Sequence, residues 1–285
     1  MRKLLFSITL LITLSNFGQS KGDSNTSDEK VVFVKKNSRH LINKNSELLI
    51  LENNDTLILT KRYIPKFSYP KFSSKKEKNR FKFRYSYIAF GSFNNKYSKN
   101  NFPIRQWNVP IKVYIDKSFS KENSIRIENF IKSFSVLEIP NLEIELVKNK
   151  NTANYYITTT NEILKVLDEK KLDQYSDERI KNRYKDNANY YLKNDANFNI
   201  YSCVLKVNPS TFIDKNNIIK KVKIRFFGSL GRFYPTMYQK GSLLDTKYIN
   251  NDTISTFDIN VLKSHYNYIY PYKVDFNLFK IIEKK

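Results

Sequence analysis

The chain has 285 residues, of which 40% are hydrophobic, and it carries a formal net charge of +23. Because 20 Tyr and 21 Phe contribute to that apolar content, there is enough of it for a packed core, and disorder of the whole chain is excluded. Cys203 is the single cysteine, so no intrachain disulfide can form.

The positive charge comes mainly from lysine, and arginine, which binds phosphate through paired hydrogen bonds, is sparse. Lysine is over-used together with Asn, Ile, Phe and Tyr, all of which have A/T-rich codons, so part of the charge reflects codon bias. We therefore expect no specific nucleic-acid partner. A weak, salt-sensitive attraction to lipopolysaccharide, anionic polysaccharide or lipid head groups is compatible with the composition.

Residues 1–20, “MRKLLFSITLLITLSNFGQS”, have the pattern of a secretory signal peptide. Two basic residues precede an apolar run from Leu4 to Leu14, and small and polar residues follow it. The run is shorter than the roughly 20 residues that span a bilayer, so we expect cleavage, after Ser20 or alternatively after Gly18. No later segment is apolar enough to span a membrane, which predicts a secreted or periplasmic protein without a transmembrane span.

The next segments predict a small β unit separated from the main domain. Residues 21–30 are polar and indicate a flexible leader. Residues 31–62 form an N-terminal β segment, in which Asn53-Asn54-Asp55 lies between two apolar runs and indicates a β-hairpin. Residues 63–80 contain Pro65, Pro70 and a basic run, which indicates a linker, and the domain 81–285 follows.

The first half of this domain alternates strands with one helix. Residues 104–116 predict a strand with Pro110 at an edge or at its start. Ser118 or Ser120 caps a helix whose apolar residues recur at helical spacing: Ile127, Phe130, Ile131, Phe134 and Leu137. Strands at 142–147 and 153–160 follow. This order predicts an α+β fold in which the helix packs on a mixed sheet.

In the second half, residues 161–196 predict a helix followed by an excursion over the surface. Strands are expected at 197–207 and 218–227, then a helix that begins at Ser255 or Thr256, and a closing helix near the C-terminus. Cys203 lies in the first of these strands and is expected to be a buried, inert thiol. The alternative is a nucleophile paired with His265.

The domain contains three segments with a common order: “YIAFGS” (87–92), “RQWNVPIKVYI” (105–115) and “ISTFDINVLKSHYNYIYP” (254–271). Together with Ala153-Asn154, their order resembles that of an uncharacterised family of secreted bacterial proteins regarded as zincin-like, distant relatives of matrixin-type metallopeptidases. Asp258, Leu262 and Tyr266 occupy the places of the family's Asp-initiated helix. The resemblance implies a metalloprotease-like body.

The stretch “IRFFGSLGRFYP” (224–235) decides whether the resemblance extends to catalysis. With Gly231 placed on the final Gly of the zincin motif H-E-x-x-H-x-x-G, the two His positions fall on Ile224 and Gly228 and the Glu position on Arg225. A third ligand would fall on Tyr234. Zinc needs three N, O or S ligands and the reaction needs a general base, so we predict no catalytic residue, no metal and no cofactor.

Two interpretations of this stretch remain. In one, it packs a helix or turn against the sheet. In the other, a groove persists there and is lined by four side chains that suit a glycan or an acidic chain: Arg225, Arg232, Tyr234 and Tyr238.

Other catalytic signatures are missing from the sequence. His40 and His265 lie far apart, no G-x-S-x-G or phosphate-binding G-x-x-x-x-G-K-[ST] occurs, and Glu143 and Glu145 alternate with apolar residues and should face solvent. Three hypotheses follow. The first is a non-catalytic protein that binds a peptide, glycan or anionic envelope component. The second is a hydrolase or peptidase with an unrecognised site built from Asp, Glu and His265. The third is a structural protein held by charge on the cell envelope.

Overall fold

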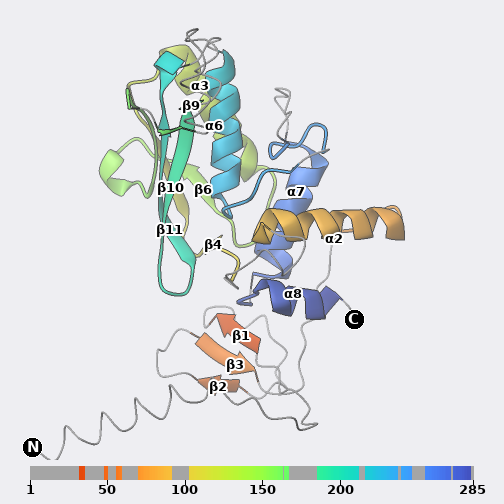
Figure 1. The fold of residues 1–285 in the computed structure, drawn as a ribbon. Helices are drawn as coiled ribbons and strands as arrows, with labels where there is room; N and C mark the ends of the chain where they lie inside the picture. The colour runs from red at the N-terminus through yellow and green to blue at the C-terminus, as the bar shows by residue number, and fades with distance from the viewer. Residues whose placement is uncertain are drawn as a thin grey trace, which may run out of the picture.

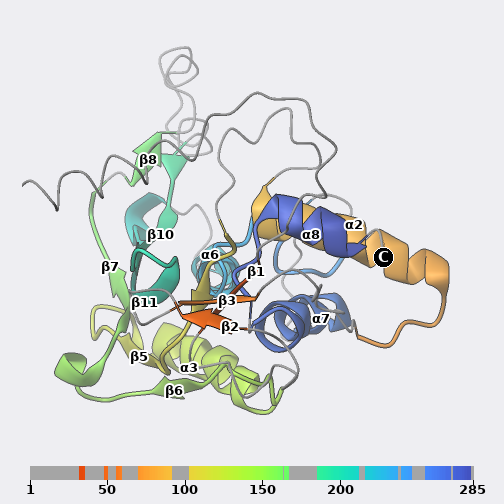
Figure 2. The same ribbon diagram turned by 90° about the horizontal axis from the view of Figure 1, so that it is seen from below.

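The computed structural model describes residues 32–35, 48–50, 56–59, 70–91, 103–162, 164–166, 185–211, 216–236, 239–245, 254–270 and 272–283. The fold is α+β, as the sequence predicted, with helices packed on one face of a six-stranded mixed sheet (Figure 1). In the view from below, the sheet lies at one side, α3 and α6 lie against it, and α2, α7 and α8 form a further layer (Figure 2).

The six-stranded sheet is parallel except at one edge. Its strands follow the order β10 (Ala188–Asn194), β11 (Asn199–Val207), β7 (Tyr155–Thr159), β5 (Ile111–Ile115), β6 (Ile144–Leu146), and β4 (Gln106–Trp107) pairs with the start of β11. The hairpin β10–β11 is antiparallel and every other pair is parallel. The predicted strands over 142–147, 153–160 and 197–207 are confirmed, and the one predicted over 104–116 is present as two separate strands.

Pro110 divides the predicted strand 104–116 into β4 and β5, as expected of a residue that has no N–H for the ladder. The Asn154 side chain stabilises this break, because its Oδ1 accepts from the Lys112 N–H at 2.8 Å and its Nδ2 donates to the Pro110 carbonyl at 2.9 Å. Asn154 thus ties the beginning of β7 to the beginning of β5.

Strand β10 corrects the prediction of a surface excursion over 161–196. Ala188 is buried and Tyr191 is exposed in a strand whose residues alternate between the two faces of the sheet. In the sequence, the many charged residues of this segment concealed the alternation of side chains that is typical of a strand. Residues Lys165–Val166 form strand β8, paired with β9 (Lys185–Asp186), so the helix predicted there is wrong at these positions. Residues 167–184 lie outside the described part.

Helix α3 (Lys121–Ser135) confirms the predicted helix, and Ser120 is its cap, with its hydroxyl accepting from the Asn123 N–H. Its buried side chains are Ile127, Phe130, Ile131 and Phe134. Glu143 and Glu145 are both exposed, as predicted.

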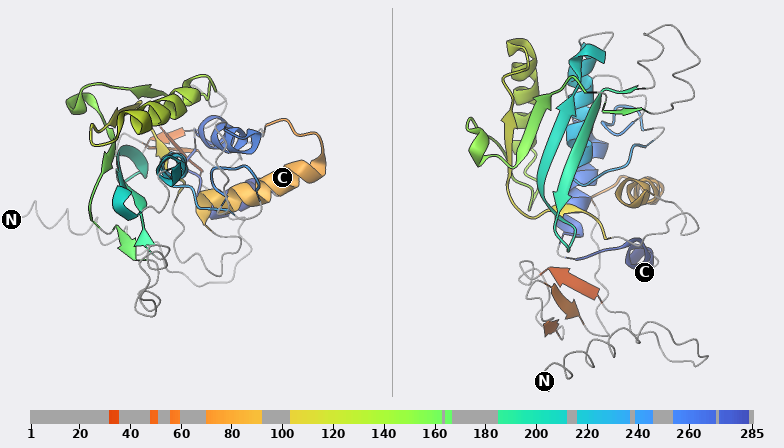
Figure 3. Two further views of the ribbon diagram at one scale, coloured as in Figure 1. Left: turned by 90° about the horizontal axis from the view of Figure 1, so that it is seen from above. Right: turned by 60° about the vertical axis from the view of Figure 1, so that its left-hand side comes forward.

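The strand predicted over 218–227 is wrong, because this run lies in helix α6 (Asn216–Ser229). β-Branched residues favoured the strand, but Ile218, Val222 and Phe226 follow helical spacing and are all buried. Phe226 packs against the Tyr155 ring of β7, with 5.0 Å between ring centroids. Burial against the sheet therefore outweighs intrinsic propensity, and α3 and α6 cover one face of the sheet (Figure 3).

The remaining helices form a second layer. They are α2 (Lys75–Phe90), α7 (Thr256–Lys263), a π-helical turn (Ser264–Tyr268) and α8 (Phe276–Glu283). Ser255 caps α7, and α8 is the predicted closing helix. Residues 75–80, predicted as part of a linker, are instead the first turns of α2, with Ser74 as the cap. Tyr85 of α2 packs against Phe279 of α8 at 5.9 Å between ring centroids.

The N-terminal β segment is a three-stranded antiparallel sheet with the order β1 (Val32–Lys35), β3 (Thr56–Leu59), β2 (Leu48–Ile50). Leu48 pairs with Leu59 and Ile50 with Leu57, which confirms the predicted hairpin. Residues 1–31, which include the predicted signal peptide and leader, lie outside the described residues. Among the helices that are described, none has both the length and the apolar character needed to cross a bilayer.

Candidate functional site

The positions of the zincin motif lie on and just beyond α6. Ile224 and Arg225 are half-buried on the helix, and Gly228 is buried one residue before its end at Ser229. The positions onto which the sequence alignment set the zincin ligands therefore lie on a helix, and their side chains are apolar, absent or cationic. Within the described part of the chain, no three His, Cys, Asp or Glu side chains are grouped closely enough to hold a metal ion.

His265 is buried and bonded through both ring nitrogens. The Tyr85 hydroxyl lies 2.9 Å from Nδ1, and the carbonyl of Arg105 lies 2.7 Å from Nε2. Since a carbonyl can only accept, Nε2 carries the proton and Nδ1 accepts from Tyr85. Burial raises the pKa of Tyr85 well above its usual value, which keeps this donor protonated. Neither nitrogen is left for a metal or a nucleophile, so the role of His265 is structural.

The residues that carry the family resemblance are parts of the core. Tyr266 accepts a hydrogen bond from the Trp107 N–H at 3.1 Å and donates its own hydroxyl proton to the carbonyl of Leu230. It thereby joins the π-helical turn to β4 and to the end of α6. Trp107 stacks on Tyr155, with 6.0 Å between ring centroids. The spacing of these residues in the sequence is therefore explained by their packing in the core.

Cys203 is fully buried on β11. Burial raises the pKa of its thiol to about 12, against smaller effects of hydrogen bonds with Tyr155 and Ser229. A thiol that stays protonated and has no access to solvent is a poor nucleophile. The structure places His265 against Tyr85 and Arg105, so the pairing of Cys203 with His265 is wrong.

Three of the four predicted groove residues meet at one small cavity. Arg225, Arg232 and Tyr234 line a pocket of about 140 Å³, which we call the arginine pocket. Its other lining residues are Tyr190, Ile224, Gly228, Phe233, Pro235 and Leu244. Tyr238 lies outside the described residues. The two lining arginines come from different elements, because Arg225 belongs to α6 and Arg232 to the segment after it.

The side chains of the arginine pocket are held by specific contacts. Arg225 donates from Nε to the carbonyl of Ala188 on β10 at 2.7 Å. Tyr234 donates its N–H to the carbonyl of Ile88 at 2.9 Å, and its ring lies against Gly91, the left-handed C-cap of α2. A Cβ at Gly91 would come within 2.7 Å of that ring, so the glycine is needed for both its backbone conformation and this contact.

The pocket is positively charged. Burial raises the pKa of Tyr190 to about 12, while the charges of Arg225 and Arg232 act in the opposite direction. The pKa of the neighbouring Arg105 guanidinium is lowered by burial and by the charge of Arg232. Of the described residues that line the cavity, none carries a carboxylate. Two guanidinium groups therefore line one cavity, and the charge of Arg105 acts on one of them, which favours a bound anion.

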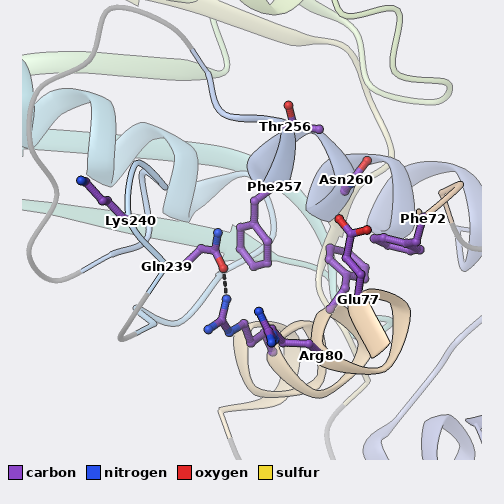
Figure 4. A pocket seen from close by; sticks show the side chains of 10 residues that line it. Phe72, Glu77, Arg80, Gln239, Lys240, Thr256, Phe257 and Asn260 are labelled. Atoms are coloured by element: carbon purple, nitrogen blue, oxygen red, sulfur yellow. Dashed lines mark hydrogen bonds between the residues drawn. The ribbon is translucent and has the colours of Figure 1, made fainter. Parts of the chain in front are cut away.

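A second and larger cavity, which the sequence does not predict, lies between α2 and α7. It has a volume of about 480 Å³, and we call it the aromatic pocket (Figure 4). Phe72, Phe81 and Phe257 supply its rings. The other lining residues are Glu77, Arg80, Arg84, Gln239, Lys240, Thr256 and Asn260. The sequence signal for this cavity is that Arg80 and Arg84 lie one helical turn apart beside Phe81. It was missed because residues 63–80 were predicted to form a linker.

Both pockets use residues from the segments 230–236 and 239–245, and the second segment is anchored by a buried carboxylate. Asp258 accepts from the Ser242 hydroxyl at 2.6 Å, the Leu243 N–H at 3.0 Å and the Ser255 hydroxyl at 2.8 Å. Burial raises its pKa and these hydrogen bonds oppose the rise. Asp258 fixes the turn before Leu244 to the beginning of α7, so walls of both pockets depend on it.

The face of the sheet opposite α3 and α6 carries a row of tyrosines. Tyr114 pairs with Tyr156, Tyr156 with Val204, and Val204 with Tyr191 across four adjacent strands. Part of this row borders a cavity of about 260 Å³. Lysines beside the row have acidic partners, as in Lys206–Glu162 at 3.2 Å. The charge of this face is therefore more balanced than that of the arginine pocket.

In comparisons with known proteins, no family model and no curated protein matches this chain. The zincin-like body therefore stays a prediction from the order of its segments.

Proposed function

We propose that this protein acts by binding and not by catalysis, and that the arginine pocket takes an acidic group of an extracellular polymer or peptide. The main support is the convergence of Arg225 and Arg232, with Arg105 nearby, on a cavity whose described lining has no carboxylate. A bound carboxylate, sulfate or phosphate would offset the mutual repulsion of these guanidinium groups and accept their hydrogen bonds.

The size of the cavity supports a polymeric ligand. Its volume of about 140 Å³ is below the roughly 300–1,000 Å³ of pockets that enclose a small molecule. It is sufficient for a single acidic substituent. The rest of the ligand would lie outside, along the half-exposed ring of Tyr234, which is 39% exposed. A chain that presents repeated acidic groups fits this geometry better than a compact metabolite does.

The proposal includes a zincin-like ancestry and a secreted or periplasmic location. The order of strands and helices and the helical position of Ile224, Arg225 and Gly228 support the first. The pattern of residues 1–20 supports the second. In this view α6 keeps the place of a catalytic helix, and the arginine pocket beside it replaces the metal site with an anion site.

The binding part is tested with polygalacturonate and its methyl ester, which has the same backbone without the charge. We expect the acid to bind and the ester not to bind. Arg232→Gln should weaken acid binding about tenfold, the effect of losing one hydrogen-bonded charge. The control Lys132→Gln removes one charge from an exposed position of α3 and should have little effect. Equal losses from both variants would show diffuse attraction to the basic surface and would contradict the proposal.

The non-catalytic part is tested by the zinc content of the chain, purified without chelators, and by an assay with a general protease substrate. We expect less than stoichiometric zinc and no cleavage. About one tightly bound zinc per chain together with cleavage would contradict this part, and the ligands would have to lie outside the motif positions.

A second candidate function is binding of a neutral glycan on the outer face of the sheet, favoured by the row Tyr114–Tyr156–Val204–Tyr191. Tyrosine rings offer flat apolar surfaces to the C–H faces of sugars, with a polar tip for hydrogen bonds. Tyr191 is 46% exposed, so Tyr191→Ala should not disturb the core. Retardation in a native gel that contains a neutral glucan, lost in Tyr191→Ala and kept in Arg232→Gln, would identify this site.

A further inference from the structure

The aromatic pocket combines rings and cations in a cavity of about 480 Å³, within the range of pockets that enclose small molecules. The Phe81 ring lies 5.1 Å from that of Phe72 and 5.7 Å from that of Phe257, measured between ring centroids. These three residues come from the segment before α2, from α2 itself and from α7. Together they form an apolar surface against which a ring of a ligand could pack.

The lining of the cavity also contains three cations. Arg80, Arg84 and Lys240 all line the cavity, and Figure 4 shows Arg80 below Phe257 and Lys240 on the adjoining segment. The pKa of Arg84 is lowered by burial and by the charge of Arg80, and raised by Asp245. Two like charges held one helical turn apart repel each other, and an anion between them would relieve this repulsion.

Glu77 determines where an anion could lie. Its carboxylate accepts from the N–H of Ser73 at 3.0 Å and from the hydroxyl of the same residue at 2.6 Å. Figure 4 shows it near Phe72 and Asn260, on the other side of the cavity from Gln239. Gln239 accepts a hydrogen bond from Arg84. Of the described residues that line the cavity, Glu77 is the one carboxylate. The charge of Arg80 acts on Glu77, and Asp245 acts on Arg84 from outside the lining, so an acidic group is favoured on the side of Arg84 away from Glu77.

We propose that the aromatic pocket is a second binding site, specific for a small molecule that carries one aromatic or similarly flat apolar ring and one acidic group. The ring packs against Phe81 and Phe257, and the acidic group lies between Arg80 and Arg84. This ligand differs from that of the arginine pocket because the whole molecule, and not one group of it, lies in the cavity. The proposal does not depend on the proposed function, because it rests on other residues.

The pocket is built to keep its shape. Thr256, Phe257 and Asn260 follow the Ser255 cap of α7, and Asp258 ties this cap to Ser242. The buried carboxylate of Asp258 therefore fixes both walls of the cavity that face α2, namely α7 and the segment that contains Ser242. A preformed cavity loses little free energy to ordering when a ligand binds.

The test uses naphthalene-2-carboxylate as the probe and naphthalene-2-methanol as its uncharged counterpart, titrated into the full chain by calorimetry. We expect one naphthoate per chain, and binding of the alcohol at least about tenfold weaker. Arg84→Gln and Arg80→Gln should each weaken naphthoate binding about tenfold. Arg80 is exposed, so the second variant remains informative if the first loosens the segment that contains Gln239.

The matched control is Lys78→Gln, which removes a charge from the same helix at a position that does not line the pocket. It should leave naphthoate binding unchanged, and so should Arg232→Gln in the arginine pocket. Equal binding of acid and alcohol, or equal loss in Lys78→Gln and Arg80→Gln, would overturn the inference. Loss of polygalacturonate binding in Arg232→Gln with naphthoate binding intact separates this site from the proposed function.

Discussion

The arginine pocket and the aromatic pocket both use residues from the segments 230–236 and 239–245, yet they differ in what surrounds these residues. The first lies against α6 and β10 and has two arginines around about 140 Å³. The second lies against α2 and α7 and has three phenylalanines and three cations around about 480 Å³. The small cavity suits one acidic group of a larger chain, and the large one suits a whole ring with its acid.

Charge alone does not define a site in so basic a chain. With a net charge of +23, every surface attracts anions to some degree, and salt weakens all such attraction. The pockets differ from the rest of the surface in having cations held close together by the fold, such as Arg225 by the Ala188 carbonyl and Arg84 by Gln239. The predictions below separate these held charges from the general surface.

The largest effect is expected from Asp258→Ala. The change leaves the Ser242 and Ser255 hydroxyls and the Leu243 N–H without their buried acceptor. We expect a loss of about 3 kcal/mol in the free energy of unfolding, measured by urea denaturation. Naphthoate binding should fall more than polygalacturonate binding, because Asp258 holds α7. Asp258→Asn, which keeps one acceptor oxygen, should lose less; equal losses would show that these hydrogen bonds contribute little.

The next effect is that of Gly91→Ala, which should act on the arginine pocket. The backbone at Gly91 has φ of 71°, and a Cβ would come within 2.7 Å of the Tyr234 ring. We expect destabilisation of about 2 kcal/mol and weaker polygalacturonate binding, because Tyr234 must move. In the double variant with Tyr234→Ala, the contact is gone and about 1 kcal/mol of conformational cost should remain. Additive losses would contradict this explanation.

The next prediction concerns the reactivity of the Cys203 thiol, which belongs to neither pocket. Because burial raises its thiol pKa to about 12, about one thiol in ten thousand is ionised at pH 8. We expect no reaction with a disulfide reagent at pH 8 until guanidinium unfolds the chain, and then one thiol per chain. Rapid reaction of the folded protein would revive the nucleophile hypothesis.

The same shift gives a pH dependence of stability. The thiol of the unfolded chain ionises near the ordinary cysteine pKa of 9.0 and the folded one near 12, so ionisation favours the unfolded chain as pH rises through this window. The contribution of Cys203 to stability is therefore fully present below pH 9 and declines above it. Cys203→Ser should lose stability less steeply between pH 9 and 11 than the wild type. Identical slopes would show that the thiol does not contribute.

The sequence predicted most elements whose buried residues have a clear period. Helix α3 and strands β5, β7 and β11 follow from such patterns, and Pro110 and Ser120 mark their ends. It failed at α6, where β-branched residues favour a strand in isolation and packing against Tyr155 and Phe130 decides for a helix. It also failed at β10, which is half-exposed and gains its stability from pairing with β11.

The candidate sites also include one part that the sequence predicts and another that it does not. Arg225, Arg232 and Tyr234 are close in sequence, which allows them to be predicted together, and the structure places them around one cavity. Tyr190 and Arg105 cannot be predicted in this way, because only the folded sheet brings them near the arginine pocket. The aromatic pocket joins α2 to α7 across more than 170 residues of sequence, between Phe81 and Phe257. No local pattern contains such a contact.

The most direct test that the two pockets are separate sites is a crossed titration of polygalacturonate and naphthalene-2-carboxylate into the wild type, Arg232→Gln and Arg84→Gln. We expect Arg232→Gln to weaken polymer binding about tenfold and to leave naphthoate binding unchanged, and Arg84→Gln to do the reverse. If either variant weakened both ligands equally, the two pockets would not be separate sites, and the role of charges held by the fold would be contradicted.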